Sequence, residues 1–386
     1  MIRSFFIILV LYPILLSAQK DRFLSVQAEK GEGIFALLDR YNLQVNSCCK
    51  DKFCELNKMT LADHLVIGKS YKIPILVYQY NGKSIRSTIG NNNWDLAKKI
   101  EQFNDLMYEI GRKRTDYRKA DKILWVPYHY LNCNEVKEDL TPRNRHFPIF
   151  GEKNEHIPLK DKRLKGAVYY LVSGHGGPDP GAMAKYKNTY LYEDEYAYDI
   201  TLRLAKNLIA SGALVYLIVR DKNDGIRDAE ILKNDTDERC WKDQAIPLDQ
   251  KQRLRQRSQV INQLYRRNKS RGAAYQRVVE IHVDSRKETK CIDLFFYHHP
   301  KNSRAKKLAE KMHRVMKEKY AKHRRSGVYN GEVLSRDLHM LREVKPIPVF
   351  VEVGNIQNKN DQKRILYASN RQALADWLYE GLVKDY

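Results

Sequence analysis

Apolar and polar positions divide the sequence into an N-terminal part of mixed elements and a C-terminal part in which strands and helices alternate. From residue 166 onward, short apolar runs typical of buried strands are separated by segments with apolar residues at helical spacing. The runs that predict strands are 167–172, 214–219, 278–282, 292–297 and 349–353, and the helical segments are 196–208, 254–264, 304–320 and 373–382. This alternation predicts an α/β domain over 166–386, in which helices flank a mostly parallel twisted sheet.

The N-terminal part predicts smaller α+β units. Residues 24–78 contain a short strand, a glycine turn, helical spacing and a closing strand that we expect Pro74 to end. A weaker, possible second copy follows at 79–131, with helical spacing after Trp94 and a strand at 122–127. The next segment, 132–165, has three prolines and no sustained periodicity, which indicates a linker or an extended strap.

Composition excludes a disordered chain and points to an anionic partner. The 386 residues are 43% hydrophobic and include 25 tyrosines, enough for a sizeable core. The 69 Lys and Arg residues outnumber the 47 acidic residues, which gives a formal net charge of +22. Such a charge attracts polyanions without specifying nucleic acid, membrane surface or wall polymer.

The first residues narrow this choice because they resemble an export signal. Arg3 is followed by an apolar run from Phe5 to Leu16, which is too short to span a bilayer. We expect residues 1–18 to be a cleaved signal peptide, and no later stretch to form an integral membrane segment. The mature protein is then periplasmic, or extracellular and associated with the cell wall, and nucleic acid is excluded as a partner. The six cysteines permit disulfides or free thiols, whose pairing the sequence leaves open.

Four residues at strand ends and helix starts carry candidate chemistry. His175 lies among glycines after the first strand of the α/β domain, Glu193 opens the next helix, and His282 ends a later strand. Two histidines and one glutamate would leave the fourth position of a catalytic zinc ion open. Glu352, in the last apolar strand, would then be free to take a proton from water.

Each residue also has a simpler interpretation. A histidine at a strand end is commonly a hydrogen-bonded structural residue, and Glu193 would be favoured at a helix N-terminus by the helix dipole. Glu352 would also fit a buried salt bridge with an arginine. His298 and His299 are expected to be structural, because adjacent residues of a strand point to opposite faces.

The order of these motifs resembles that of the zinc-dependent N-acetylmuramoyl-L-alanine amidases of the Amidase_3 type. The matching motifs are G-H-G-G-P-D-P-G-A at 174–182, Glu193 with Ile200, V-R-D at 219–221, Leu254, Arg257 and Asn262, E-I-H at 280–282, and V-E-V-G at 351–354 with Ile356 and Asn358. The resemblance implies that His175, Glu193 and His282 bind Zn²⁺ and that Glu352 is the catalytic glutamate. It departs from the family pattern at Ser173, Ile261 and Asn355, which affects the rim of the site.

The N-terminal unit resembles the LysM carbohydrate-binding module. The resemblance rests on Lys30-Gly31-Glu32 and on L-x-x-G-x-x-x-x-I-P at 65–74. It implies binding of glycans that contain N-acetylglucosamine. The alternative is a spacer domain without a ligand.

The family resemblance implies a peptidoglycan hydrolase that cleaves the amide between N-acetylmuramic acid and L-Ala of the stem peptide. A zinc peptidase acting on wall stem peptides and a non-catalytic peptidoglycan-binding protein remain as alternatives. The excess positive charge lies mainly in 251–277, with nine basic and no acidic residues, and in 301–325, with eleven against two. Peptidoglycan and anionic envelope polymers are therefore the expected partners. The need for an activating protein and the role of the extra segment at 222–250 stay open.

Overall fold

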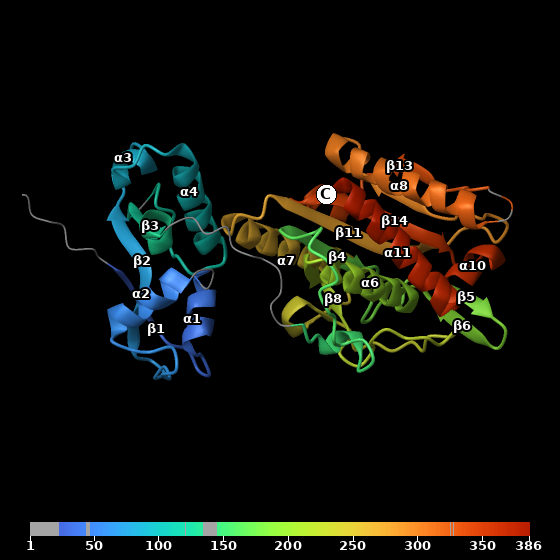
Figure 1. Cartoon of the computed structure of the whole chain (residues 1–386), viewed down its shortest axis with the longest axis horizontal. Helices are drawn as coiled ribbons and strands as arrows, with labels where there is room; N and C mark the ends of the chain where they lie inside the picture. Colours follow the sequence, from blue (N-terminus) through green and yellow to red (C-terminus); the bar gives the residue numbers. More distant parts are fainter. Residues whose placement is uncertain (1–22, 44–46, 120, 134–144, 325, 327) are drawn as a thin grey trace, which may run out of the picture. The chain divides into compact units, whose positions relative to one another are not determined.

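The computed structural model describes residues 23–43, 47–119, 121–133, 145–324, 326 and 328–386 (Figure 1). The chain forms two compact units, Met1–Val136 and Lys137–Tyr386. The predicted signal peptide, 1–18, lies outside the described residues. No helix in the described ranges combines the length and the hydrophobicity that crossing a membrane requires.

The N-terminal unit is built on a three-stranded antiparallel sheet in the order β1-β2-β3. Its elements are β1 (Phe23–Gln27), α1 (Ile34–Arg40), α2 (Ser47–Asn57), β2 (Ser70–Gln79), α3 (Ile85–Ile89), α4 (Trp94–Glu109), β3 (Ile123–Pro127) and α5 (Tyr128–Asn132). The first part of β2 pairs with β1 and its last part pairs with β3. The order strand, helix, helix, strand therefore occurs twice, with β2 as the strand that both copies share.

Pro74 does not end this strand, contrary to the sequence prediction. It lies inside β2, between Lys72, which pairs with Ser25, and Leu76, which pairs with Phe23. The register shifts here, because a step of two positions along β1, from Phe23 to Ser25, corresponds to a step of four positions along β2. Proline lacks an N–H, and a bulge is where a strand tolerates that loss. The strand consequently continues into the second copy.

The two copies also share a core. Phe53 and Tyr71 from the first copy pack in one cluster with Phe103 and Trp125 from the second. A disulfide between Cys48 and Cys133 joins the start of α2 to the segment after α5. Cys49, Cys54, Cys240 and Cys291 are free thiols. The unit is thus a single folded body rather than two modules in series.

The C-terminal unit confirms the predicted α/β architecture. Its six-stranded sheet has the order β13-β12-β14-β11-β4-β7, and every adjacent pair is parallel except β12 and β14. The strands are β4 (Ala167–Ser173), β7 (Leu214–Leu217), β11 (Tyr275–Asp284), β12 (Phe295–His298), β13 (Glu332–Ser335) and β14 (Ile347–Asn355). Smaller elements are η1 (Pro148–Phe150), β5 (Met183–Tyr186), β6 (Thr189–Tyr192), β8 (Val219–Arg220), β9 (Arg239–Cys240), η2 (Trp241–Asp243), β10 (Gln244–Ala245), α9 (His339–Glu343) and α10 (Lys359–Leu366).

Helices bury both faces of this sheet, which explains why its central strands are apolar throughout. Tyr169 and Leu171 of β4 face α6 (Glu193–Ala210), α8 (Ser303–His323) and α11 (Ala368–Asp385). Val168 and Tyr170 face the opposite side, where they pack with α7 (Gln250–Ser270). Figure 1 shows α11 running across the sheet beside α6 and α8.

Two segments without long elements are part of this packing. Residues 145–165, which the sequence predicts to belong to a linker, insert Phe150, Ile157 and Leu164 into the core of the C-terminal unit. The extra segment at 222–250 is held against α6, since Arg227 pairs with Glu195 at 2.9 Å. Both segments are therefore packed against the rest of the C-terminal unit.

Candidate metal centre

The four predicted site residues meet at the carboxyl ends of three neighbouring parallel strands. His175 lies two residues after the end of β4, His282 lies near the end of β11, and Glu352 lies near the end of β14. Glu193 is the first residue of α6. Ligand sites in such sheets gather at this edge because the loops and helix N-termini converge there.

His175, Glu193 and His282 bring their donor atoms within 4.8 Å of one another. The Nε2 atom of His175 lies 3.3 Å from Oε2 of Glu193, and the Nδ1 atom of His282 lies 2.8 Å from Oε1 of the same carboxylate. The two imidazole rings are nearly perpendicular, at 82°. Two imidazoles and a carboxylate that share one small space match the donor set of a catalytic zinc site.

Two glycines make this close approach possible. A Cβ atom on Gly174 would lie 2.3 Å from Nδ1 of His282, and one on Gly181 would lie 2.7 Å from Oε2 of Glu193. Gly181 also has a φ of 70°, which side-chain-bearing residues rarely adopt. His175 itself has a φ of 61°, a conformation that is uncommon outside glycine and is found at functional turns. The glycine-rich motif is therefore a steric requirement of the three-donor cluster.

Backbone amides fix the carboxylate of Glu193. Its Oε2 accepts a hydrogen bond from the N–H of Ala182 at 2.8 Å, and its Oε1 accepts one from Val283 at 3.0 Å. Burial alone would raise the pKa of Glu193, but its hydrogen bonds with the two imidazoles hold that pKa well below the ordinary value. Glu193 is thus kept ionised, the form that a metal ligand needs.

Each histidine has a second carboxylate on its remaining ring nitrogen. Nδ1 of His175 lies 3.0 Å from Asp179, and Nε2 of His282 lies 3.3 Å from Glu280. Carboxylates in these positions set the tautomer and orientation of a ligating imidazole. Arg253 in turn contacts Asp179 at 2.5 Å. The donor set and its supporting shell therefore both fit a divalent metal.

Glu352 lies beside the three donors, and among the described residues no hydrogen bond or ion pair of its carboxyl is found. It is 8% exposed, and its Oε2 atom is buried and accepts no hydrogen bond from the described residues. Burial raises the pKa of Glu352 well above its ordinary value, although the imidazole of His282 acts in the opposite direction. Phe350, two residues earlier, stacks on the ring of His282 at 4.3 Å between centroids. This orphaned carboxyl is the candidate acid–base group.

A cavity of about 370 Å³ opens over these residues. Its walls come from the loop after β4, the start of α7, the end of β11, the start of α9 and β14. They are His175, Asp179, Ala182, Glu193, Gln250, Arg253, Leu254, Arg257, Glu280, His282, Val283, Asp284, Ser285, Leu338, His339, Met340, Phe350 and Glu352. All four residues predicted from the sequence line the same cavity.

The sequence did not predict the part that arginines play here. Arg253 and Arg257, one helical turn apart on α7, are both buried, and Arg257 donates to the carbonyl oxygen of His175 at 2.5 Å. Both belong to the basic stretch 251–277, so part of its charge serves the site. Their i, i+4 spacing in the sequence could have indicated that both arginines lie on the same face of one helix. His298 and His299 lie elsewhere: Nδ1 of His298 is 3.0 Å from the carbonyl oxygen of His299, and Nε2 of His299 is 3.5 Å from Asp337.

The segment at 222–250 supports the loop that carries His175. Glu238 is buried and accepts a hydrogen bond from the N–H of Gly177 at 2.7 Å. Burial raises the pKa of Glu238 to about 7. A Cβ atom on Gly177 would lie 3.2 Å from Ile246, so the segment packs closely on this loop.

Comparison with known proteins gives one family and several similar folds. The profile of the family Amidase_3, described as N-acetylmuramoyl-L-alanine amidase, matches residues 170–384. No curated protein matches the sequence. Among solved structures, the CwlD amidase of Clostridioides difficile, determined in complex with the GerS lipoprotein, is 22% identical over 57% of this chain and 98% of that chain, with a TM-score of 0.43.

Two further solved structures are similar at the same level. The catalytic domain of the amidase CwlV from Paenibacillus polymyxa is 19% identical and covers 56% of this chain and 97% of its own, with a TM-score of 0.40. The amidase AmiC2 of Nostoc punctiforme is 18% identical and covers 57% of this chain and 96% of its own, also with a TM-score of 0.40.

Proposed function

Because the chain belongs to the Amidase_3 family of N-acetylmuramoyl-L-alanine amidases, we propose that it hydrolyses the amide bond between the lactyl group of N-acetylmuramic acid and L-Ala of the peptidoglycan stem peptide. The observation that carries this proposal is the convergence of His175, Glu193 and His282 beside the buried carboxyl of Glu352. A hydrolase needs a metal-binding set and an acid–base group within one cavity.

We assign His175, Glu193 and His282 as the residues that hold the metal, and Zn²⁺ as the ion. Two nitrogen donors and one carboxylate oxygen are typical zinc ligands, and a set of three leaves a position for substrate or water. When bound, zinc supplies Lewis acidity, which polarises an amide carbonyl and makes water a better nucleophile near neutral pH. Asp179 and Glu280 orient the two imidazoles through their outer nitrogens.

Glu352 is assigned as the general base in its ionised form, which a cation held by the neighbouring donors would favour against the effect of burial, and then as the general acid. Its unpartnered Oε2 atom takes a proton from the attacking water and delivers it to the leaving amine nitrogen of L-Ala. Amide cleavage then yields a lactyl carboxylate and a stem peptide with a free amino terminus. Phe350 covers one face of His282 and keeps bulk water away from that ring.

The setting of the reaction is proposed to be the cell wall outside the cytoplasm. The disulfide between Cys48 and Cys133 supports export, since such bonds persist in oxidising compartments. The strand-helix-helix-strand order of the N-terminal unit supports the proposed LysM-like glycan-binding role. Exposed basic residues of α8 would add attraction to anionic envelope polymers, which a loss of wall binding at raised salt would reveal. They are Arg304, Lys306, Lys307, Arg314, Lys317 and Lys322.

Mass spectrometry of the products from purified peptidoglycan tests the proposal. The expected products are intact stem peptides that begin with L-Ala, together with glycan strands that have lost them. Exhaustive chelation should abolish their release, and added Zn²⁺ should restore it. Activity that survives chelation would contradict the metal assignment.

The same experiment distinguishes the two alternative functions. Shortened stem peptides that stay attached to the glycan would indicate a zinc peptidase. Retention on the wall without any release, in a folded protein that takes up no zinc, would indicate a non-catalytic peptidoglycan-binding protein. Either result would overturn the amidase assignment.

A further inference from the structure

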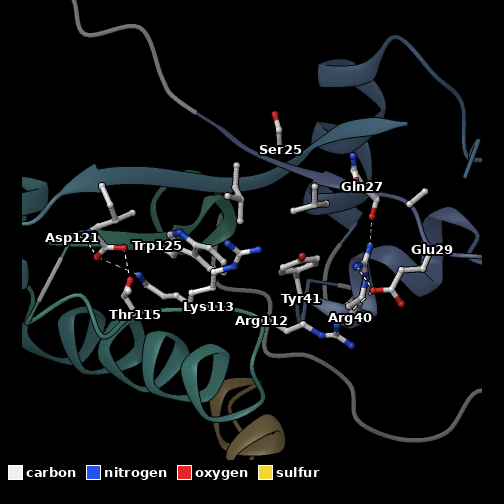
Figure 2. A pocket seen from close by; sticks show the side chains of 15 residues that line it. Ser25, Gln27, Glu29, Arg40, Tyr41, Arg112, Lys113, Thr115, Asp121 and Trp125 are labelled. Carbon is white, nitrogen blue, oxygen red and sulfur yellow. Dashed lines mark hydrogen bonds and ion pairs between the residues drawn. The ribbon is translucent and has the colours of Figure 1, made fainter. Parts of the chain in front are cut away.

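A second cavity, of about 640 Å³, lies wholly within the N-terminal unit (Figure 2). Both copies of the strand-helix-helix-strand unit line it. The first contributes β1 and the end of α1, and the second contributes the turn after α4 and β3. Figure 2 shows Glu29 and Arg40 near one end, Asp121 and Thr115 near the other, and Tyr41 and Trp125 between them.

The lining carries more positive than negative charge. Its charged groups are Arg40, Arg112, Lys113 and Arg114 against Glu29 and Asp121. Arg40 forms ion pairs with Glu29 at 2.6 Å and with Glu32 at 2.8 Å. Arg112 only approaches the same Glu29, at 3.5 Å, and no ion pair of Arg114 is found among the described residues. Arg112 and Arg114 therefore retain N–H donors that an anionic ligand could use.

Lys113 is the least satisfied of these cations. Its side chain is 3% exposed, and its ammonium lies 4.0 Å from Oδ1 of Asp121, beyond hydrogen-bond distance. Its other neighbour is the face of Trp125, 5.4 Å from the ring centre. Burial lowers the pKa of Lys113, while the nearby carboxylate of Asp121 opposes this. An ammonium has three donors, and within the described part of the chain none of them reaches an acceptor.

The carboxylate of Asp121, next to Lys113, already accepts hydrogen bonds from other groups. Oδ2 of Asp121 accepts a hydrogen bond from the hydroxyl of Thr115, and its Oδ1 accepts one from the N–H of Ile123 at 3.0 Å. Asp121 is thus held in place on the turn rather than turned fully toward the ammonium. Tyr41 and Trp125, whose ring centroids are 6.3 Å apart, supply an apolar floor. Cations beside aromatic rings suit a sugar that carries a carboxylate, because the C–H face of a pyranose can pack on the rings while the carboxylate accepts from the cations.

We propose that this cavity binds N-acetylmuramic acid residues whose lactyl carboxylate is free. The proposal rests on the function proposed above, because hydrolysis of the lactyl–alanine amide converts a neutral amide into that carboxylate. The product of the C-terminal unit would then be the ligand of the N-terminal unit. Such binding would retain the enzyme on glycan that it has already processed, close to stem peptides that remain.

Calorimetry on the full chain with Glu352→Gln, in which turnover is strongly slowed, tests the proposal. The probes are the disaccharide of N-acetylglucosamine and N-acetylmuramic acid with a free lactyl carboxylate, and the same disaccharide with that group as a methylamide. A charge-assisted hydrogen bond is expected to give the free acid at least about tenfold tighter binding. Equal affinity for the two probes would overturn the proposal.

Variants locate the site. Lys113→Met should remove the preference for the acid, whereas Lys83→Met, on an exposed lysine of the same unit that does not line the cavity, should leave it unchanged. If Lys113→Met does not fold, Arg114→Met at an exposed position should weaken the preference without unfolding the unit. A preference that is undiminished in a folded Lys113→Met or Arg114→Met would place the site elsewhere.

The two proposals fail separately. Both probes are prepared chemically, so their binding does not depend on the activity of this protein. If the protein prefers the free acid but releases no stem peptides, the muramic acid site stands and the amidase function is overturned. If the protein releases stem peptides but shows no such preference, the amidase function stands and the proposed product-binding site is overturned.

Discussion

Glu352 on β14 lies directly opposite His282 on β11, as a pair in the parallel register of two central strands. Two residues earlier on each strand, Phe350 lies opposite Glu280. Alternate residues of a strand share a face, so the pairs His282–Glu352 and Glu280–Phe350 both face the cavity. The sheet register thus places the proposed base beside a proposed ligand without help from any loop.

Glu352→Gln separates chemistry from binding. We expect the rate of stem-peptide release to fall by about 10²–10⁴-fold, the usual contribution of a general base, while bound zinc is retained. The thermal midpoint should stay the same or rise, because glutamine fills nearly the same volume and cannot place a charge at this buried position. Product release, zinc content and thermal unfolding are measured together, with Glu310→Gln on the exposed face of α8 as the control. Full activity in Glu352→Gln would refute the assignment.

Gly174→Ala tests the steric basis of the metal centre. The added Cβ would lie 2.3 Å from Nδ1 of His282, so the imidazole must move away from Glu193. We expect zinc affinity, measured by competition with a chelator, to fall by about 10–100-fold, as when a ligand loses its orientation. Gly33→Ala, where a Cβ would meet nothing within 4 Å, should leave the affinity unchanged. Unaltered affinity in Gly174→Ala would mean that the site is not built as proposed.

The sequence predicted five of the six strands of the sheet, missing the short edge strand β13, and it named four candidate site residues that the structure brings to one cavity. His175, His282 and Glu352 each follow or end an apolar strand, and parallel strands bring such positions to one edge. Long-range contacts were not predictable in this way. Arg253 meets Asp179 across 74 positions, and nothing local in either segment signals that contact.

The N-terminal unit shows a different limit of sequence reasoning. A proline usually ends a strand, so the pattern predicted two separate copies. The bulge around Pro74 depends on how β1 pairs with β2, which is a property of two strands together. The pairing of Cys48 with Cys133 likewise depends on the shared sheet and could not be chosen among six cysteines from spacing alone.

Glu238→Gln should change how stability depends on pH. Burial raises the pKa of Glu238 from 4.5 to about 7, so the folded protein holds this proton after the unfolded chain has released it. Folding of the wild type therefore becomes less favourable as the pH rises through this window. Glutamine keeps an acceptor for the N–H of Gly177 and cannot ionise. We expect equal stability near pH 5 and a gain of about 1–3 kcal/mol for the variant near pH 8.

Denaturant unfolding at the two pH values measures this difference. Glu230→Gln, at an exposed position of the same segment, is the matched control and should show no pH-dependent gain. A variant that is destabilised equally at both pH values would show that the hydrogen bond to Gly177 needs a carboxylate and that burial of the charge is not costly.

The disulfide between Cys48 and Cys133 should stabilise the N-terminal unit alone. It closes a loop between residues separated by 85 positions and restricts the unfolded chain most where that loop is long. Replacing both cysteines by serine is expected to lower the free energy of unfolding of this unit by about 2–4 kcal/mol.

Hydrogen exchange read by mass spectrometry reports each unit separately and so checks the disulfide prediction. Protection should fall in the core strands of the N-terminal unit, β1 to β3, and stay constant in β4, β11 and β14, whose core is distinct. Cys54→Ser, which removes a free thiol from the same helix α2, should leave both units protected. Stem-peptide release from soluble fragments should also be unchanged, because the cysteine pair lies outside the unit that holds the proposed zinc ligands. Equal protection with and without the disulfide would show that the shared sheet and core hold the N-terminal unit together unaided.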